Sequence, residues 1–409
     1  MINFSKIFRG DRVIWMIFMF LCFISLIEVY SASSMLTFRT NFYMPILKHV
    51  LFLLVGVGIV IGINSCKPKY FRLIVIGLPI VWIFLIALQF LGTKINDAIR
   101  DFYGFQPTEL AKLSLIAFVA FILSRQKKLF SEDFSFKMIC TVTVITCALI
   151  FKDNISTAVI LFCVIFIMMF IGQTSFKKLT SLLLVTFMVL ALIFSFAWFF
   201  PETARKANLN RVVMAINRTK VHKSQKVITK EDFVITDKNY QATQAKIALG
   251  KGGLLGTMPG NGQQRDFLPQ AYSDFIYAII IEEMGFVGGL GVLALYVFLF
   301  IRAGTIASRC PKLFPKLLVM GCTLMIVLQA CISMAVSVGL VPVTGQPLPL
   351  ISKGGTSILT TCIYFGIILS VSRYENPRGI MQEQIIDKEF EEEKRLASIN
   401  ENLSMQPGF

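Results

Sequence analysis

Charged residues are scarce in this 409-residue chain: Asp, Glu, Lys and Arg make up 16% of it, against roughly 25% in soluble globular proteins. Hydrophobic residues make up 55%, and the mean hydropathy is +0.70. These values exclude a soluble domain of this length. Segments of alternating apolar and polar residues are also missing, which argues against an outer-membrane β-barrel.

Metal-ligand and disulfide patterns are missing as well. The only two histidines, His49 and His222, are isolated from other ligand residues, so no metal-ligand cluster of the usual spacing is visible. None of the nine cysteines lies in the long segment 201–271, so no disulfide framework is expected there. The chain also shows no convincing internal repeat, a feature that many secondary transporters have.

The apolar residues gather in blocks of the roughly 20 residues that a membrane-spanning helix needs. We predict an all-α polytopic membrane protein with about ten transmembrane helices. The first is a retained helix, because its apolar run exceeds the 7–15 residues of a signal-peptide core. The fifth and sixth spans are short and closely spaced, so they could also form one long helix. The predicted spans are 13–32, 45–63, 71–92, 107–124, 136–151, 155–171, 178–200, 272–301, 314–338 and 354–373.

Lys and Arg residues orient these spans, because cytoplasmic loops carry an excess of them. One side holds sixteen: Lys6, Arg9, Arg12, Lys67, Lys69, Arg72, Arg125, Lys127, Lys128, Lys137, Lys177, Lys178, Arg302, Arg309, Lys312 and Lys316. Short loops on the other side hold five: Arg39, Lys94, Arg100, Lys152 and Lys353. Both termini are therefore predicted to be cytoplasmic. Residues 1–375 form the membrane domain, and 376–409 form a cytoplasmic tail expected to be flexible.

The segment 201–271 is the one large extracytoplasmic loop of this topology. Between 201 and 270 it has 12 Lys or Arg against five Asp or Glu. A basic surface attracts anionic ligands or lipid headgroups, although a solvated loop is the alternative. Its glycine-rich stretch 249–264 is not a nucleotide P-loop, because Gly252 and not Ser or Thr follows Lys251. Its glycines could bring backbone amides to a diphosphate, or could form an irregular turn.

Ionisable residues inside predicted spans are functional candidates by default. Glu109 and Lys112 are three residues apart and can pair on one helix face, and a structural ion pair is favoured over direct chemistry. In a continuous helix, Glu282 lies about 12 Å beyond Asp274. Glu282 and Glu283 are therefore interpreted as cavity-wall carboxylates or structural pairs. The complete set is Glu28, Glu109, Lys112, Asp274, Glu282 and Glu283, with Lys353 next to the last span.

Asp274 lies at the outer mouth of the predicted span 272–301, beside the basic loop. A partly buried carboxylate is a suitable general base near neutral pH. A carboxylate at a helix N-terminus is also stabilised by the helix dipole. From the residues alone, general base and helix cap remain equal alternatives.

Three long motifs closely resemble the SEDS family of membrane peptidoglycan polymerases. They are "FQPTELAK" (105–112), "YQATQAKIALGKGGLLGTMPGNGQQRDFLPQAYSDFIYAIIIEEMGFVGG" (240–289) and "GLVPVTGQPLPLISKGGTS" (339–357). They occur in the family's order, and the similarity covers residues 10–375. The "LPLIS" run resembles the division member, FtsW, more than the elongation member, RodA. The stretch 96–101 departs from the family pattern by lacking a Trp, and Lys353 stands where Tyr or Phe is usual.

The resemblance implies a glycosyltransferase that polymerises lipid II, with Asp274 as the catalytic carboxylate. Glu109 and Lys112 correspond to the Glu-Lys pair of the family's fourth helix. It also implies a class B penicillin-binding protein as transpeptidase partner, further division proteins, and a place in the bacterial inner membrane at the septum. A divalent cation, Mg²⁺ or Mn²⁺, could supplement the basic residues that bind the diphosphate. No nucleic-acid partner is expected. A lipid II flippase, a RodA-like elongation polymerase and a division scaffold are the alternatives. The diphosphate and lipid II contacts are expected among Arg100, Lys251, Arg265, Lys353, Ser352, Gly354 and Gly355.

Overall fold

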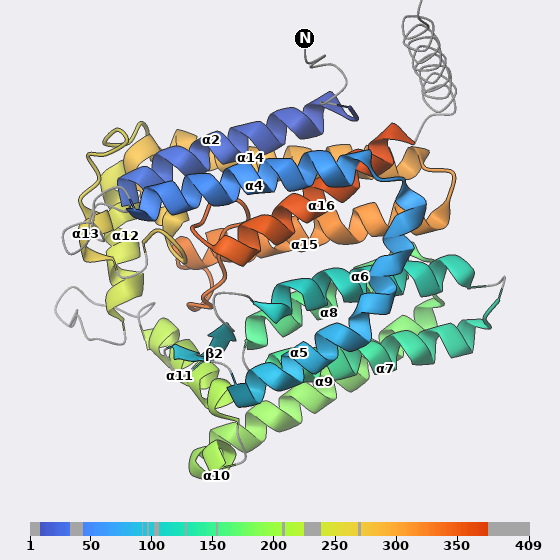
Figure 1. Cartoon of the computed structure of the whole chain (residues 1–409). Coiled ribbons are helices and arrows are strands. Elements are labelled where there is room, and N and C mark those ends of the chain that lie inside the picture. The colour runs from blue at the N-terminus through green and yellow to red at the C-terminus, as the bar shows by residue number, and fades with distance from the viewer. Residues whose placement is uncertain are drawn as a thin grey trace, which may run out of the picture.

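The computed structural model describes residues 9–32, 44–91, 93–95, 98–101, 106–126, 129–152, 154–206, 209–224, 239–268 and 271–374. Apart from one short hairpin it is helical (Figure 1). Within these ranges nine helices are long and apolar enough to cross a membrane. They are α2 (Arg12–Ala32), α4 (Met44–Ser65), η1 (Pro68–Ile76) continued by α5 (Gly77–Leu91), α6 (Pro107–Arg125), α7 (Glu132–Phe151), α9 (Phe176–Phe199), α14 (Ile276–Arg309), α15 (Leu313–Ser337) and α16 (Gly355–Arg373).

A tenth apolar helix, α8 (Ile155–Ile171), has 17 residues. It is separate from α7 and packs against it. Asn154 begins α8 as its N-cap, and its side chain accepts a hydrogen bond from the Thr157 amide at 3.2 Å. The alternative of one long helix is therefore wrong. The helical membrane fold is confirmed, whereas the side on which the termini and the long loop lie stays a prediction.

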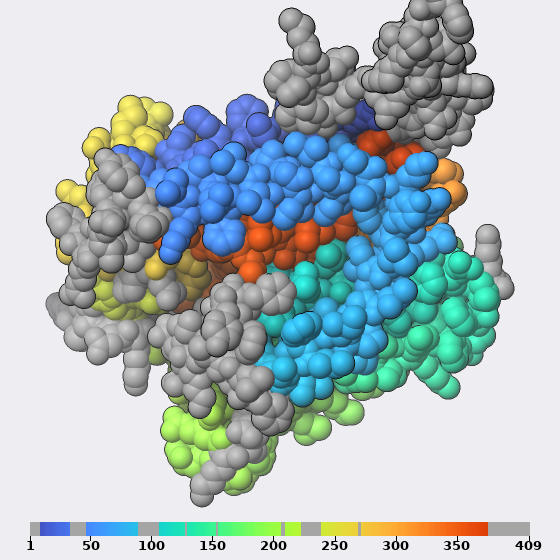
Figure 2. Space-filling view, viewed as in Figure 1, coloured from blue at the N-terminus to red at the C-terminus, as the bar shows by residue number. Residues whose placement is uncertain are grey.

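The helices form two groups, joined through α15 and α6 (Figure 1). The first group holds α2, α4, α14, α15 and α16, and the second holds α5 to α9. In α6, α15 and α16, 72% of the most apolar stretch is buried, but in α9 only 6% is. The three buried helices are therefore central and α9 is peripheral. Figure 2 shows α4 lying across one face, with α16 and α6 visible between it and α5.

The predicted extracytoplasmic loop 201–271 is largely helical where it is described. It contains α10 (Pro201–Lys206), α11 (Asn210–Ser224), α12 (Tyr240–Gly252) and α13 (Gln264–Phe267). Val212, Val213 and Ile216 of α11 belong to one buried apolar cluster with Ala197 of α9. Helix α12 packs against α14. The segment therefore docks on the transmembrane helices, unlike a plain solvated loop.

The hairpin joins α5 to α6 and consists of β1 (Thr93–Ile95) and antiparallel β2 (Ala98–Asp101). Its backbone is described, but its side chains are not. Residues 1–8 and 375–409, which include the predicted tail 376–409, lie outside the described ranges. All nine cysteines lie inside them and are free thiols.

Helix α14 differs from the predicted span 272–301. It begins at Ile276, after a turn formed by residues 271–275, and continues to Arg309. Gly285 interrupts it with φ 72° and ψ −177°. The geometry assumed for a continuous helix from Asp274 to Glu283 is therefore wrong, because Asp274 precedes the helix and the helix is broken two residues after Glu283.

Candidate active site

A cavity of about 130 Å³ lies where four long helices begin. The first residues of α6, α8 and α16 border it, and Asp274 lies two residues before the start of α14. Helix N-termini carry positive partial charge and unpaired N–H groups, so their convergence favours an anion. The lining residues are Gln106, Thr108, Glu109, Asn154, Thr157, Ser273, Asp274, Gly345, Gln346, Pro347, Lys353, Gly354 and Ser357.

Asp274 is half-buried at the wall of this cavity. Its Oδ1 accepts a hydrogen bond from the Ser273 hydroxyl at 3.1 Å. The N-cap residue of α14 is Phe275, which makes no side-chain cap. Asp274 therefore lies one position outside the helix-capping position, and this geometry favours the general-base interpretation.

Lys353 reaches the same cavity because the segment before α16 is tied to the turn before α14. The Lys353 amide donates to the Tyr272 carbonyl at 2.9 Å. The Lys353 ammonium lies 4.8 Å from the centre of the Tyr272 ring. Burial, and to a lesser degree the nearby charge of Lys48, lowers the pKa of Lys353 below its usual range. Among the described residues, the cavity thus combines two carboxylates, Asp274 and Glu109, with one partly desolvated cation, Lys353.

The other candidates from the last motif have different positions. Gly354 lines the cavity. Ser352 is buried, and its hydroxyl donates to the Ser273 carbonyl at 2.6 Å and accepts from the Leu348 amide at 2.7 Å. A Cβ atom on Gly355 would lie 2.9 Å from the Phe52 ring. Ser352 therefore holds the turn in place, and Gly355 permits close packing on α4.

Lys251 and Arg265 do not border the cavity that contains Asp274. Lys251 donates to the Gln263 side chain at 2.7 Å. Arg265 donates to the Ser31 hydroxyl at 2.9 Å and lies 3.9 Å from Glu283. Arg100 lies in β2, and its side chain is outside the described part of the chain. Of the three basic candidates whose side chains the structure describes, Lys353 is the one that it brings to Asp274.

Glu109 and Lys112 form the expected ion pair, with 2.7 Å between Oε1 and Nζ. Lys112 is 1% exposed. It also donates to Gln329 Oε1 of α15 at 3.2 Å, and the Gln329 amide donates to the Pro347 carbonyl at 3.1 Å. Glu109 borders the cavity, whereas Lys112 does not. The pair therefore links α6, α15 and the segment that carries Lys353.

Several polar lining residues were not predicted as site residues. Gln106, Thr108, Gln346 and Ser357 lie inside the quoted motifs, which could have marked them. Asn154 and Thr157 lie outside all three motifs, and no signal pointed to them. Both accept hydrogen bonds from the Gln346 amide, at 3.1 and 2.9 Å. This contact joins α8 to the segment before α16 and closes that side of the cavity.

The glycine-rich stretch 249–264 pairs with the break in α14 at Gly285. The amides of Thr257 and Met258 donate to the carbonyls of Glu282 and Glu283, at 3.0 and 2.9 Å. In the other direction, the Phe286 amide donates to the Gly253 carbonyl at 2.9 Å. A broken membrane helix needs such partners for the backbone groups that the break releases. The irregular-turn alternative is therefore the one observed.

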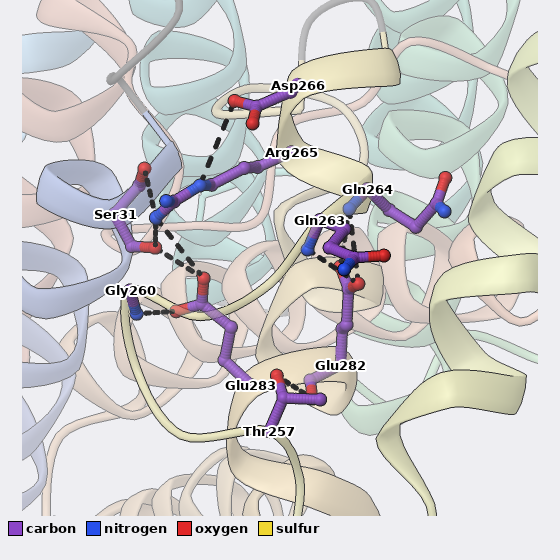
Figure 3. Close-up of polar contacts among 9 residues, drawn as sticks. All are labelled: Ser31, Thr257, Gly260, Gln263, Gln264, Arg265, Asp266, Glu282 and Glu283. Atoms are coloured by element: carbon purple, nitrogen blue, oxygen red, sulfur yellow. Dashed lines mark hydrogen bonds and ion pairs between the residues drawn. The ribbon is translucent and has the colours of Figure 1, made fainter.

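Glu282 and Glu283 are fully buried beside this break, and neither borders the Asp274 cavity. Figure 3 shows their polar contacts. The Glu282 carboxylate accepts from the amides of Gln263 and Gln264, at 3.0 and 3.1 Å. The Glu283 carboxylate accepts from the Ser31 hydroxyl and, at 3.1 Å, from the Gly260 amide. The main partners of the two carboxylates thus lie in the segment 260–264 and in α2. The carboxylates anchor the segment 260–264 to α14, which agrees with the structural alternative and not with a wall of the Asp274 cavity.

Comparison with known proteins identifies the family of the chain. A family model described as "Cell cycle protein" (FtsW, RodA, SpoVE) matches residues 11–377. The chain belongs to this family, the SEDS family. Proteins named "Probable peptidoglycan glycosyltransferase FtsW" are similar to it. The protein from Marinobacter nauticus is 31% identical over 359 residues, 83% of each chain. The protein from Geobacter sulfurreducens is 28% identical over 385 residues, 91% of this chain and 97% of that protein.

Solved structures show the same SEDS fold. A chain of a peptidoglycan synthase complex aligns with a TM-score of 0.70 and 20% identity, covering 90% of this chain and 99% of that chain. Thermus thermophilus RodA aligns with a TM-score of 0.62 and 22% identity, covering 89% and 97%. The curated relatives carry the FtsW name, so this SEDS chain is FtsW-like in sequence.

The fold of this SEDS chain should depend on the backbone at Gly285. A Cβ atom there would lie 2.3 Å from the Leu254 carbonyl oxygen, and the φ of 72° is unfavourable for other residues. We expect Gly285→Ala to lower the free energy of unfolding by at least about 1–3 kcal/mol, the typical cost of such a conformation. Thermal unfolding of the purified protein measures this.

The matched control is Gly291→Ala, six residues further along the same helix, where a Cβ atom would meet nothing within 4 Å. Alanine favours helix over glycine by about 1 kcal/mol, so this variant should be as stable as wild type or more stable. Equal unfolding temperatures for the two variants would show that the break does not require glycine.

Proposed function

We propose that this protein polymerises lipid II into glycan strands, with release of undecaprenyl diphosphate and inversion at the anomeric carbon. The chain is a peptidoglycan glycosyltransferase of the SEDS family. The observation that supports the proposal best is the shared cavity of Asp274 and Lys353, at which α6, α8 and α16 begin. A carboxylate can accept a proton there, while a cation and helix N-termini stabilise a diphosphate.

The reaction needs one base. The 4-hydroxyl oxygen of one lipid II sugar attacks the anomeric carbon of a second lipid II. A new C–O bond forms, the bond to the diphosphate breaks, and Asp274 accepts the hydroxyl proton. Diphosphate is a good leaving group, so no general acid is required. A single displacement without a covalent intermediate inverts the anomeric centre, which converts an α-linked donor into a β-linked strand.

The negative charge that develops on the leaving diphosphate faces Lys353 and the helix N-termini. Preorganised charges of this kind stabilise a transition state strongly, because they need no reorganisation. The described residues contain no group of three or more His, Cys, Asp or Glu that could hold a metal ion. Mg²⁺ is often held by one or two carboxylates and the substrate phosphates, and Asp274 is suited to contact such an ion. Mn²⁺ would be held in the same way.

The site would act on the extracytoplasmic face of the inner membrane, because the positive-inside bias places the segment 201–271 there. The FtsW-named relatives support a role at the division septum. The chain would work with a class B penicillin-binding protein that crosslinks the strands. The similar fold in a peptidoglycan synthase complex supports such a partner.

The test is lipid II polymerisation by the purified full-length protein with its cognate penicillin-binding protein, with glycan products resolved by length. Glycan strands from wild type are the expected result. If the protein instead moves lipid II across vesicles and forms no glycan, the flippase alternative is correct. Depletion in cells separates division from elongation, because loss of a division polymerase gives filaments and loss of an elongation polymerase gives round cells.

The charge of Lys353 should govern substrate affinity. A hydrogen bond to a charged group is worth roughly 1.5–3 kcal/mol, so Lys353→Met should raise the KM for lipid II about 10- to 100-fold. Because the pKa of Lys353 is lowered, wild type should lose this affinity at a lower pH than an ordinary lysine would. Lys353→Arg should lose this affinity only at a higher pH than wild type, as measured by KM for lipid II against pH.

The control is Lys251→Met, because Lys251 lies outside the cavity. An equal rise in the KM of that variant would contradict the assignment of the diphosphate to Lys353.

A further inference from the structure

A second cavity, of about 250 Å³, lies at the end of the bundle opposite to Asp274. Helix α14 begins near Asp274 and ends at Arg309, next to this cavity. Its 34 residues correspond to about 50 Å of helix. The cavity lies where η1, the turn between α14 and α15, and the end of α16 meet (right side of Figure 1). Nothing in the proposed polymerase chemistry uses this cavity.

Four cations border the second cavity: Lys67, Lys69, Arg72 and Lys312. All four are exposed, and no carboxylate belongs to its lining. The walls are apolar, formed by Pro68, Pro311, Phe314, Pro315, Val371 and Tyr374, with Cys310. A cationic rim around an apolar cleft matches an amphiphile with an anionic head.

Two other cations at this end of the bundle form ion pairs. Arg302 pairs with Asp11, with 2.7 Å between Nε and Oδ2. Lys178 pairs with Asp133 at 2.6 Å. Within the described part of the chain, none of the four rim cations forms an ion pair. The Arg72 guanidinium lies 5.5 Å from the centre of the Phe314 ring, which holds it over the apolar wall.

We propose that this cavity binds the headgroup of an anionic phospholipid, such as cardiolipin or phosphatidylglycerol. The phosphate would lie among Lys67, Lys69, Arg72 and Lys312, and the glycerol and upper acyl chains would lie along Phe314 and Val371. Basic pockets between transmembrane helices at the cytoplasmic surface are suited to anionic headgroups. The positive-inside bias places this end of the bundle on that side. The proposal is independent of the polymerase activity.

The test is native mass spectrometry of the full-length protein in detergent, titrated with cardiolipin, phosphatidylglycerol or phosphatidylethanolamine. The variant is Lys69→Gln with Lys312→Gln. The matched control is Lys137→Gln with Lys177→Gln, two exposed lysines that the topology places on the same side. Each cation near an anionic headgroup contributes about 1 kcal/mol, a factor of about five in affinity. The variant should therefore bind anionic lipid about 30-fold more weakly, and the control should change less than twofold.

Three outcomes would overturn the proposal. The first is equal weakening in variant and control, which would mean general attraction of anionic lipid to basic loops. The second is phosphatidylethanolamine binding as tightly as the anionic lipids, or displacement of lipid by millimolar inorganic phosphate. The third is anionic lipid binding only after Glu391, Glu392 and Glu393 are replaced by Gln, which would assign the cavity to the acidic segment of the chain itself.

Discussion

Asp274→Asn is expected to reduce lipid II polymerisation by about 10²- to 10⁴-fold, the usual contribution of a positioned general base. The amide is close in size to the carboxylate and can still accept a hydrogen bond from the Ser273 hydroxyl, but it cannot accept the proton of the attacking hydroxyl. The KM should change little, because the substrate diphosphate is assigned to Lys353. Initial rates of glycan formation with the partner penicillin-binding protein present give both values.

The control for this variant is Asp266→Asn in α13. Asp266 is exposed and lies outside the Asp274 cavity, so the rate should stay within a few-fold of wild type. Equal unfolding temperatures would show that Asp274→Asn is folded. A folded Asp274→Asn protein that polymerises at the wild-type rate would refute the role of Asp274 as base, and would leave Glu109 as the other carboxylate among the described residues of the cavity.

Lys112→Met should be the most destabilising single substitution near the site. It removes the partner of Glu109, which is 8% exposed, and leaves a charge in the interior. Breaking a buried ion pair in this way typically costs about 3–5 kcal/mol. It also removes the donor to Gln329, which holds the segment of Lys353 through Pro347. The fall in unfolding temperature in detergent is the measurement.

The double variant Glu109→Gln with Lys112→Met distinguishes pairing from packing. Without a buried charge, most of the lost stability should return, because replacing both members of a buried pair is often near neutral. If the double variant is as unstable as Lys112→Met, the loss comes from packing of the lysine stem. If it is stable but inactive, Glu109 acts directly at the cavity that it borders.

The proposed lipid site and the proposed active site lie at opposite ends of the helical bundle. The reaction is assigned to the end where four helices begin, and the anionic headgroup to the end where α14 and α16 finish. Helix N-termini attract anions at the first end. At the second end α14 and α16 end, but η1 and α15 begin, so the helix dipoles there oppose one another and side-chain cations supply the attraction. Four basic residues border the second cavity, whereas Lys353 is the one basic residue among the described residues that line the first.

The helices themselves could be read from the sequence, because membrane insertion depends on the local content of apolar residues. The pairing of Glu109 with Lys112 could also be predicted, since residues three apart share one face of a helix. Asp274 stood out because it follows a basic segment and precedes an apolar one. Each of these inferences depends on neighbours within a few residues, which is the range over which a sequence carries direct physical information.

Tertiary structure alone decided which distant groups share a site. The Ser352 hydroxyl bonds to the Ser273 carbonyl across 79 residues, and this contact brings Lys353, but not Lys251 or Arg265, to Asp274. The break at Gly285 takes its hydrogen-bond partners from the segment 253–258, and no pattern in the sequence predicted that pairing. No local periodicity encodes these contacts, because they arise only when buried backbone groups must find partners within the folded bundle.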